Sequence, residues 1–188
     1  GRSGSGKSTI LGLMLGILQS TSGKVLLNAQ PSNDFFENHK IKTGYVGTEP
    51  FLIEGTIKDN LYYGHSDEGE ITNEQYDKAL QFSNLYELIE SLPGKMKYKI
   101  SENGEGLSAG QKQRLSLARA ILILPKLLIL DEVSANLDTE TELDIAKSIK
   151  YLKGKSTVVI VSHKQGILQF ADSVIDLEQI NHSHQYRK

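Results

Sequence analysis

Residues 1–8 of the chain read GRSGSGKS and fit the pattern GxxxxGK(S/T) at every fixed position. Glycines in such a loop let backbone N–H groups point at phosphate oxygens, and the N-terminus of the following helix adds its positive end. In this pattern Lys7 reaches the β- and γ-phosphates of a nucleotide, and the Ser8 hydroxyl holds Mg²⁺. A Gly/Ser-rich linker is the alternative interpretation, but the apolar run at residues 10–18 predicts a helix directly after the loop. The sequence therefore predicts a phosphate-binding loop.

The second informative stretch is residues 127–132, LLILDE, an apolar strand that ends in two carboxylates. In a parallel sheet, ligands bind in the crevice outside the carboxyl ends of the strands. Asp131 can hold Mg²⁺ there, and Glu132 can orient or deprotonate a water that attacks the γ-phosphate. An ordinary strand followed by an acidic turn is the alternative, and the phosphate-binding loop favours the catalytic interpretation over it.

Two further residues lie where they could meet a phosphate. His163 follows the apolar strand predicted at residues 157–162, and its ring could donate a hydrogen bond to a γ-phosphate. Ser108 lies where a helix N-cap is expected, and its hydroxyl and the helix N–H groups can face an anion. A structural histidine and an ordinary helix cap are the alternatives for these two residues.

The rest of the chain alternates between short apolar runs and segments of helical spacing. We expect strands at residues 24–27, 42–46, 127–130, 157–161 and 173–177. We expect helices at residues 10–18, 72–80, 111–122 and 139–152, with a capping box formed by Thr72 and Gln75. The first helix is so rich in apolar residues that we expect it to be buried on most sides. This alternation predicts an α/β fold whose sheet is covered on both faces.

The composition excludes several classes of protein. A length of 188 residues suits one domain, or one domain with an inserted subdomain. The 21 Lys and Arg against 23 Asp and Glu give a net charge of -2, which argues against nucleic-acid binding through a global basic field. With no cysteine, the chain has no disulfide scaffold, thiolate nucleophile or thiolate zinc site. No stretch approaches the roughly 20 apolar residues that cross a bilayer, and because residue 1 is not Met we expect a fragment of a longer protein.

The order of the motifs resembles one protein family. The phosphate-binding loop, LSAGQ at residues 107–111, the strand before Asp131 and Glu132, and His163 follow one another as in the ATP-binding cassette of ABC transporters. This likeness covers nearly the whole chain and implies an α/β fold: a P-loop NTPase core with a mostly parallel sheet flanked by helices, plus an inserted α-helical subdomain. The implied domains are a core at residues 1–50 and 111–180 that lacks its N-terminal strands, a helical subdomain at 51–110 that ends in the signature motif, and a polar tail at 181–188.

The resemblance also implies roles for individual residues. ATP and Mg²⁺ are the expected cofactors. The expected catalytic residues are Glu132 as the base, His163 as the switch histidine, and Lys7. The residues expected to bind the nucleotide are Gly1, Ser3, Gly4, Ser5, Gly6, Lys7, Ser8, Thr9, Ser108, Gly110 and Gln111. The residues expected to ligate the metal are Ser8, Asp131 and Thr48.

Further segments resemble the parts of the family that meet its partners. Residues 49–61, EPFLIEGTIKDNL, resemble the exporter-type stretch that opens the helical subdomain, and residues 102–106 resemble the loop that contacts the membrane domain. Residues 134–138, SANLD, resemble the loop that touches the second cassette of a head-to-tail dimer, in which residues 108–111 close on the nucleotide of the other cassette. The expected partners are therefore a second cassette and a transmembrane domain, and no nucleic acid.

The sequence also departs from the family pattern. Thr48 stands where the family usually has a Gln that ligates the metal, and the neighbouring Glu49 is an alternative ligand. Ala109 replaces a Gly of the signature, and Ala135 replaces a Ser in residues 134–138. None of these changes touches the phosphate-binding loop or the residues expected to activate water.

The resemblance implies an ATPase that couples hydrolysis of ATP to ADP and phosphate with transport across a membrane, in the direction of export. The expected location is the cytoplasmic face of a membrane, through fusion to or association with a transmembrane domain. Two alternatives are a soluble ABC-type ATPase that acts on nucleic acid or ribosomes, and a nucleotide-binding regulatory module without catalysis. Because the family's first strands and its adenine-stacking aromatic precede the phosphate-binding loop, we expect weak hydrolysis by this chain alone.

Overall fold

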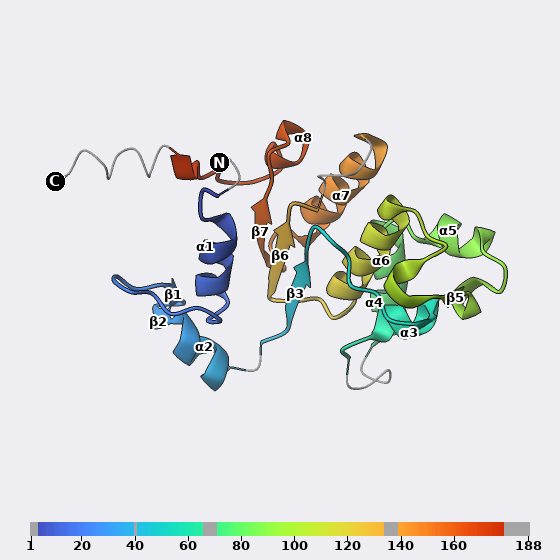
Figure 1. Ribbon diagram of the computed structural model, residues 1–188, viewed down its shortest axis with the longest axis horizontal. Helices are drawn as coiled ribbons and strands as arrows, with labels where there is room; N and C mark the ends of the chain where they lie inside the picture. The colour runs from blue at the N-terminus through green and yellow to red at the C-terminus, as the bar shows by residue number, and fades with distance from the viewer. Residues whose placement is uncertain (1–3, 40, 66–70, 134–138, 179–188) are drawn as a thin grey trace. The chain divides into compact units, whose positions relative to one another are not determined.

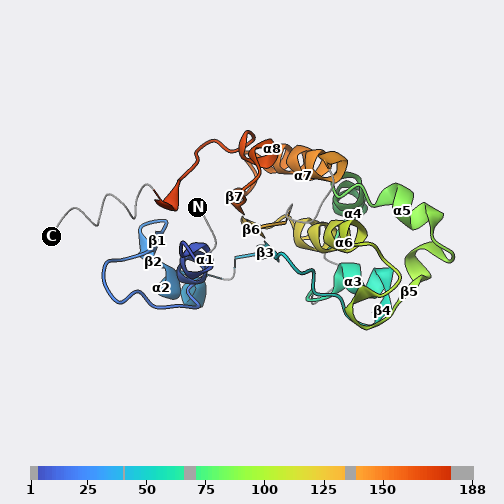
Figure 2. The ribbon, with the colours of Figure 1, turned by 45° about the horizontal axis from the view of Figure 1, so that its top comes forward.

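The computed structural model describes residues 4–39, 41–65, 71–133 and 139–178, which belong to two compact units (Figures 1 and 2). The first unit comprises Gly1–Ile41 and Asp172–Lys188, and the second comprises Lys42–Ala171. The phosphate-binding loop lies in the first unit, whereas the other predicted site residues lie in the second.

The first unit contains a helix that follows the glycine-rich loop, and a small hairpin. Its elements are α1 (Lys7–Met14), β1 (Leu26–Leu27), β2 (Gln30–Pro31) and α2 (Ser32–Asn38). The two strands pair antiparallel, and the strand predicted at residues 24–27 covers only Leu26–Leu27. Ser32 ties α2 to the end of α1, because its hydroxyl donates a hydrogen bond to the Leu13 carbonyl over 2.8 Å.

The prediction that the first helix is buried on most sides is wrong. Leu11 is the one buried residue of α1, whereas Ile10 is 38% exposed and Ile17, beyond the helix end, is 74% exposed. Within its described residues the first unit buries only the apolar side chains of Leu11 and Phe35. The apolar pattern predicted a helix whose side chains could be buried. Within this unit, however, too few neighbouring residues pack against α1 to bury them.

The prediction of a strand at residues 173–177 is also wrong. Residues 173–176 form neither helix nor strand, and the side chains of Val174 and Ile175 are exposed. A strand needs a neighbour that satisfies its backbone hydrogen bonds, and none of the strands in the described ranges pairs with this segment.

A parallel sheet forms the centre of the second unit. β6 (Leu127–Asp131) lies between β3 (Thr43–Val46) and β7 (Thr157–Val161), as Figure 1 shows. Residues 127–130 are all buried, as expected for the middle strand of a covered sheet. Because both pairings are parallel, the carboxyl ends of the three strands lie at one edge of the sheet. The predicted α/β fold with a parallel sheet is confirmed.

Two long helices share a core with this sheet. They are α6 (Ala109–Leu122) and α7 (Thr139–Leu152), and the short helix α8 (Gln165–Leu168) follows β7. α6 lies close to β3, because a Cβ on Gly44 would be only 2.8 Å from the Ala120 carbonyl oxygen. The buried members of this core are Val46, Leu117, Ala120, Ile121, Leu128, Leu130, Val133, Ile145, Ile149, Leu152 and Ile167.

Helices are the main regular elements in the segment between β3 and α6. Its elements are α3 (Ile57–Tyr62), α4 (Asn73–Phe82), α5 (Tyr86–Ser91), the 3-10 turns Lys95–Lys97 and Glu102–Gly104, and the antiparallel pair β4 (Gly55–Thr56) and β5 (Lys99–Ile100). α4 begins at the predicted capping box, in which the Gln75 N–H donates to the Thr72 hydroxyl and the Thr72 N–H donates to the Gln75 side chain. The capping box is therefore confirmed.

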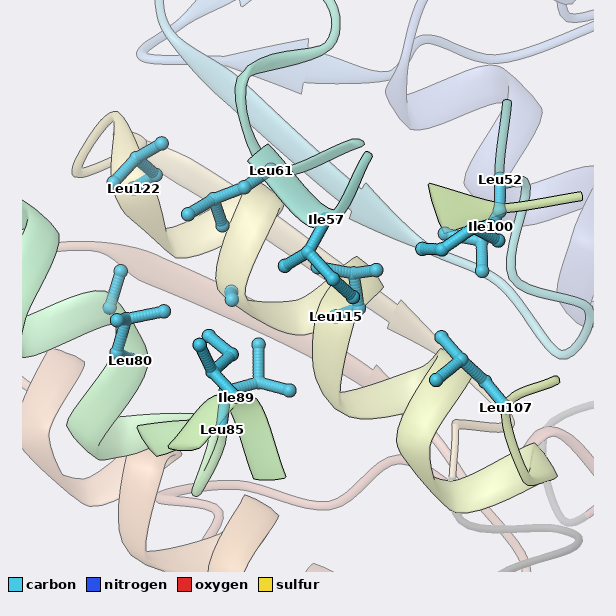
Figure 3. Packing of buried hydrophobic residues seen from close by; sticks show 12 residues of the cluster. Leu52, Ile57, Leu61, Leu80, Leu85, Ile89, Ile100, Leu107, Leu115 and Leu122 are labelled. Carbon is cyan, nitrogen blue, oxygen red and sulfur yellow. The ribbon is translucent and has the colours of Figure 1, made fainter. Parts of the chain in front are cut away.

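The helical segment packs on α6 through a second core (Figure 3). Its buried members are Leu52, Ile57, Leu61, Ala79, Leu80, Leu85, Ile89, Ile100, Leu107, Leu115, Ala118 and Leu122. α6 thus contributes to both cores, with Leu115 and Leu122 in this one and Leu117 and Ile121 in the core of the sheet. Each fully buried Leu or Ile side chain stabilises the fold by about 1.5–3 kcal/mol. Because α6 supplies such side chains to both cores, it joins the helical segment to the sheet.

Both parts belong to one compact unit, and the predicted subdomain boundary at residues 51–110 stays a prediction. Among the described residues, no helix is both long enough and apolar enough to cross a membrane.

Candidate functional site

The predicted phosphate-binding loop runs directly into α1. Gly4 has φ +80° and Gly6 has φ +93°, backbone angles that side-chain-bearing residues rarely adopt. Gly6 is the N-cap of α1, and it has no side chain that could cap the helix. A helix that begins this way suits an anion.

The hydroxyl of Ser5 gives independent support for a ligand at this loop. Its oxygen is buried and has no hydrogen-bond partner among the described residues. A buried polar atom without a partner costs about 1–3 kcal/mol, which a hydrogen-bonding ligand atom would recover. Ser8 and Thr9 are exposed, whereas Gly1 and Ser3 lie outside the described residues.

At the carboxyl edge of the sheet, two neighbours hold Asp131 at the end of β6. The Tyr45 hydroxyl donates a hydrogen bond to Asp131 Oδ2 over 3.2 Å, and the Thr48 hydroxyl donates to the Asp131 carbonyl over 3.3 Å. Burial and the negative charge of Asp131 raise the pKa of Tyr45, so this hydroxyl keeps its proton and acts as the donor. The carboxylate is thus held at the strand end and is half-buried.

Glu132 turns the chain sharply after β6. Its N–H still donates to the Val161 carbonyl over 2.8 Å, but its φ of +51° is left-handed. A non-glycine residue in this conformation costs roughly 1–3 kcal/mol, and such strain is typical of functional sites. The turn brings Glu132 Oε1 within 3.0 Å of His163 Nε2, across two parallel strands. The exposed fractions of the two side chains are 28% for Glu132 and 51% for His163, so water can reach the pair.

The loop that carries His163 is itself anchored. The Lys164 N–H donates to the Ser162 hydroxyl over 3.0 Å, and Lys164 Nζ lies 3.3 Å from Glu142 Oε2 on α7. Asp131 and Glu132 at the end of β6 therefore lie beside His163, which follows the adjacent strand β7. This arrangement can orient a water and accept a proton from it.

The second predicted phosphate contact, at the start of α6, is a capping box. The Gln111 N–H donates to the Ser108 hydroxyl over 3.3 Å, and the Ser108 N–H donates to Gln111 Oε1 over 2.8 Å. Ser108 is exposed, and Gly110 is half-buried within the first turn. The predicted N-cap is confirmed, and the role of this segment toward a nucleotide stays a prediction.

The donor set suits Mg²⁺ held largely by phosphate. Among the described residues, no group of three or more His, Cys, Asp or Glu side chains could form a metal cage. Mg²⁺ usually binds one or two carboxylates together with substrate phosphates and waters, and Asp131 supplies one such carboxylate. Thr48 and Glu49 are both exposed, and of the two it is the Thr48 hydroxyl that is hydrogen-bonded to Asp131, through the Asp131 carbonyl. Residues 134–138, with Ala135, lie outside the described residues.

Sequence reasoning missed Tyr45 and two polar links to α6. Gln113, a buried residue of α6, donates from Nε2 to the Gly47 carbonyl over 3.0 Å. Arg119 donates from Nε to the Asn60 carbonyl over 2.6 Å and from Nη1 to the Phe51 carbonyl over 2.7 Å. The only sequence signal for these contacts is a polar residue inside an apolar helical pattern, which does not identify the partner.

The comparisons with known proteins agree with one another. A family model described as "ABC transporter" matches residues 1–135. The chain is 35% identical to the "Multidrug resistance ABC transporter ATP-binding and permease protein" of Lactococcus lactis subsp. lactis, over 95% of this chain and 30% of the relative. It is 38% identical to the "ATP-dependent lipid A-core flippase" of Pseudoalteromonas atlantica, again over 95% of this chain and 30% of the relative.

Among solved structures, a bacterial Atm1-family ABC exporter with ATP bound is similar to this chain with a TM-score of 0.77 and 27% identity, over 89% of this chain and 29% of the other. The chain thus spans about 30% of the length of the curated relatives it matches. The similarity in fold confirms the predicted P-loop NTPase architecture, and the motif order, the family model and the relatives together show that the chain belongs to the ABC transporter family.

Proposed function

We propose that this chain binds MgATP and hydrolyses it, and that the whole protein uses the reaction to export a substrate across a membrane. The observation that carries the proposal is the pairing of Glu132 with His163, next to Asp131, at the carboxyl edge of a parallel sheet. Membership of the ABC transporter family supports ATP as the nucleotide, because the matched residues 1–135 include the phosphate-binding loop and both acids.

In this proposal the loop before α1 binds the triphosphate. Backbone N–H groups of residues 4–9 bind phosphate oxygens, Lys7 neutralises the β- and γ-phosphates, and Ser5 gains a partner for its buried hydroxyl. Gly1 and Ser3 complete the loop. The left-handed angles of Gly4 and Gly6 support this role, because a Cβ at either position would strain the loop.

Ser8, Asp131 and Thr48 are the residues that we assign to Mg²⁺, with Thr48 acting through a bound water. When bound, Mg²⁺ neutralises charge that develops on the β- and γ-phosphates. Asp131 would contribute its carboxylate and Ser8 its hydroxyl. The position of Thr48 against the Asp131 carbonyl supports its assignment.

Glu132 orients the attacking water and accepts its proton, while His163 holds the carboxylate and reaches the γ-phosphate. A positioned base of this kind contributes roughly 10²–10⁴-fold to a rate. The strained φ of Glu132 and the anchored loop of His163 support the assignment, since both keep the pair in place without a ligand.

Ser108, Gly110 and Gln111 would close on the nucleotide of a second cassette in a head-to-tail dimer. The support is that Ser108 is exposed at the N-terminus of a 14-residue helix, where phosphate is bound favourably. A transmembrane domain is the other proposed partner, which places the chain at the cytoplasmic face of a membrane. The two relatives described above are a multidrug resistance transporter and a lipid A-core flippase, which favours export over the soluble ATPase.

Replacement of Glu132 by Gln tests the proposal. We expect Glu132→Gln to bind ATP as tightly as the wild type but to release phosphate about 100-fold more slowly or worse, because the amide cannot accept the proton. Glu87→Gln, which changes an exposed acid in the first turn of α5, is the matched control and should hydrolyse ATP normally. Both variants are made in the whole protein. Unchanged phosphate release by Glu132→Gln would refute the assignment, and ATP binding without hydrolysis by the whole wild-type protein would favour the regulatory module.

A further inference from the structure

Tyr45 is not among the residues assigned above to the nucleotide, the metal or the water, yet its hydroxyl contacts the carboxylate assigned to the metal. It is the third residue of β3, and its neighbours Gly44 and Val46 are buried while Tyr45 is 51% exposed. Since side chains alternate along a strand, Tyr45 lies on the other face of β3 from the core. From there its hydroxyl donates to Asp131 Oδ2 on the neighbouring strand over 3.2 Å.

The loop after β3 is built to accept the Tyr45 ring. A Cβ on Gly47 would lie 3.1 Å from Tyr45 Cε1 and 3.4 Å from its hydroxyl oxygen, closer than most real Cβ contacts. The absence of a side chain at Gly47 therefore leaves space for the ring. Gln113 holds Gly47 from α6 over 3.0 Å, and Thr48 holds the same loop to the Asp131 carbonyl over 3.3 Å.

These contacts would restrict the last side-chain torsion of Asp131, which otherwise varies widely. The last torsion of an aspartate side chain has a broad profile, so an exposed carboxylate without a partner adopts several orientations. A phenol that donates to one oxygen selects one of them. Groups that orient a metal ligand in this way commonly change metal affinity or activity by about 10–100-fold.

We propose that Tyr45 is a positioning residue for Asp131, which it holds in the orientation that meets Mg²⁺. The inference rests on the proposed function, because it takes Asp131 to be a metal ligand. Tyr45 itself touches neither metal nor nucleotide in this account. It acts through the Asp131 carboxylate, and Gly47 acts through Tyr45.

The test compares nucleotide affinity with and without the metal, on the full chain. A fluorescent ATP analogue is titrated in magnesium chloride and again in EDTA. Because the hydroxyl is partly exposed and water can replace it, we expect Tyr45→Phe to weaken affinity in Mg²⁺ by about threefold to tenfold, the lower end of such effects. Affinity in EDTA should be unchanged, and Tyr86→Phe, an exposed tyrosine on α5, should match the wild type in both buffers.

A second variant keeps the hydroxyl and moves it. Gly47→Ala displaces the Tyr45 ring and should reproduce the loss that is specific to Mg²⁺. Thermal unfolding of both variants shows whether they fold. An equal loss in Mg²⁺ and in EDTA would overturn the inference, because it would show a general structural role, and so would affinities equal to the wild type in both buffers. A wild type whose affinity does not depend on Mg²⁺ would instead overturn the proposed function, and this inference with it.

Discussion

Asn60 is the buried polar residue whose replacement the structure predicts to be most damaging to the helical segment. It is fully buried, and its side chain makes four hydrogen bonds: to the Ile53 N–H and carbonyl, to the Thr56 carbonyl, and to Arg119. The two bonds to Ile53 close the turn that leads into α3, and the bond to Arg119 links that turn to α6. Asn60→Ala removes all four.

The magnitude follows from the groups left without a partner. Asn60→Ala strands the N–H and the carbonyl of Ile53, whereas Arg119 keeps its bonds to the main-chain carbonyls of residues 60 and 51. Each buried polar group without a partner costs about 1–3 kcal/mol, and Ile53 is only half-buried. We therefore expect the free energy of unfolding to fall by about 2–4 kcal/mol.

Urea denaturation followed by circular dichroism measures this loss. Asn73→Ala, which changes an exposed asparagine at the start of α4, is the control and should change the free energy of unfolding by less than about 0.5 kcal/mol. Combining Asn60→Ala with Arg119→Leu should give less than the sum of the two single effects, because the residues share one network. A loss below about 1 kcal/mol for Asn60→Ala, or strict additivity with Arg119→Leu, would refute this reasoning.

Three further predictions concern α6 and its neighbours. Gly44→Ala should lower the free energy of unfolding by about 1–3 kcal/mol in urea denaturation, because its Cβ would meet the Ala120 carbonyl oxygen at 2.8 Å; an unchanged midpoint would contradict the close approach of α6 to β3. Ser108→Ala should cost about 1 kcal/mol by removing the acceptor of the Gln111 N–H, and Ser108→Asp should restore most of it, so equal stabilities of the two variants would be inconsistent with the cap. Burial, together with the positive charges of Arg119 and Lys42, lowers the pKa of His65, so the unfolded chain binds this proton more tightly than the folded one. The free energy of unfolding should then fall as the pH drops below about 6.5, and a pH profile of His65→Gln with the same slope as the wild type would argue against it.

The sequence predicted most of the elements with strong patterns. Residues 127–131, 139–152 and 157–161 have the expected structure because a continuous apolar run or a clear helical period leaves few alternatives. The capping box at Thr72 and the N-cap at Ser108 could be predicted because the residues that form each of them lie within one turn. The burial of α1 and the strand at 173–177 depend on neighbours far along the chain, and both predictions were wrong.

In the candidate site, too, the sequence predicted the local motifs but not the contacts between distant residues. Motif spacing identified the phosphate-binding loop, Asp131, Glu132 and His163 as candidates. It did not predict that His163 would contact Glu132, because this contact requires β6 and β7 to be paired in a register that no short motif encodes. Tyr45 was missed for the same reason, since its partner lies 86 residues away on another strand.

A crystal structure of the full chain with Mg²⁺ and a non-hydrolysable ATP analogue would show whether residues 4–9, Asp131 and Glu132 act on one nucleotide. We expect the triphosphate to lie against the loop before α1, with Lys7 on the γ-phosphate, Asp131 facing the Mg²⁺ ion, and a water between Glu132 and the γ-phosphate. A triphosphate bound away from residues 4–9, or Glu132 turned away from the γ-phosphate with no water between them, would contradict it.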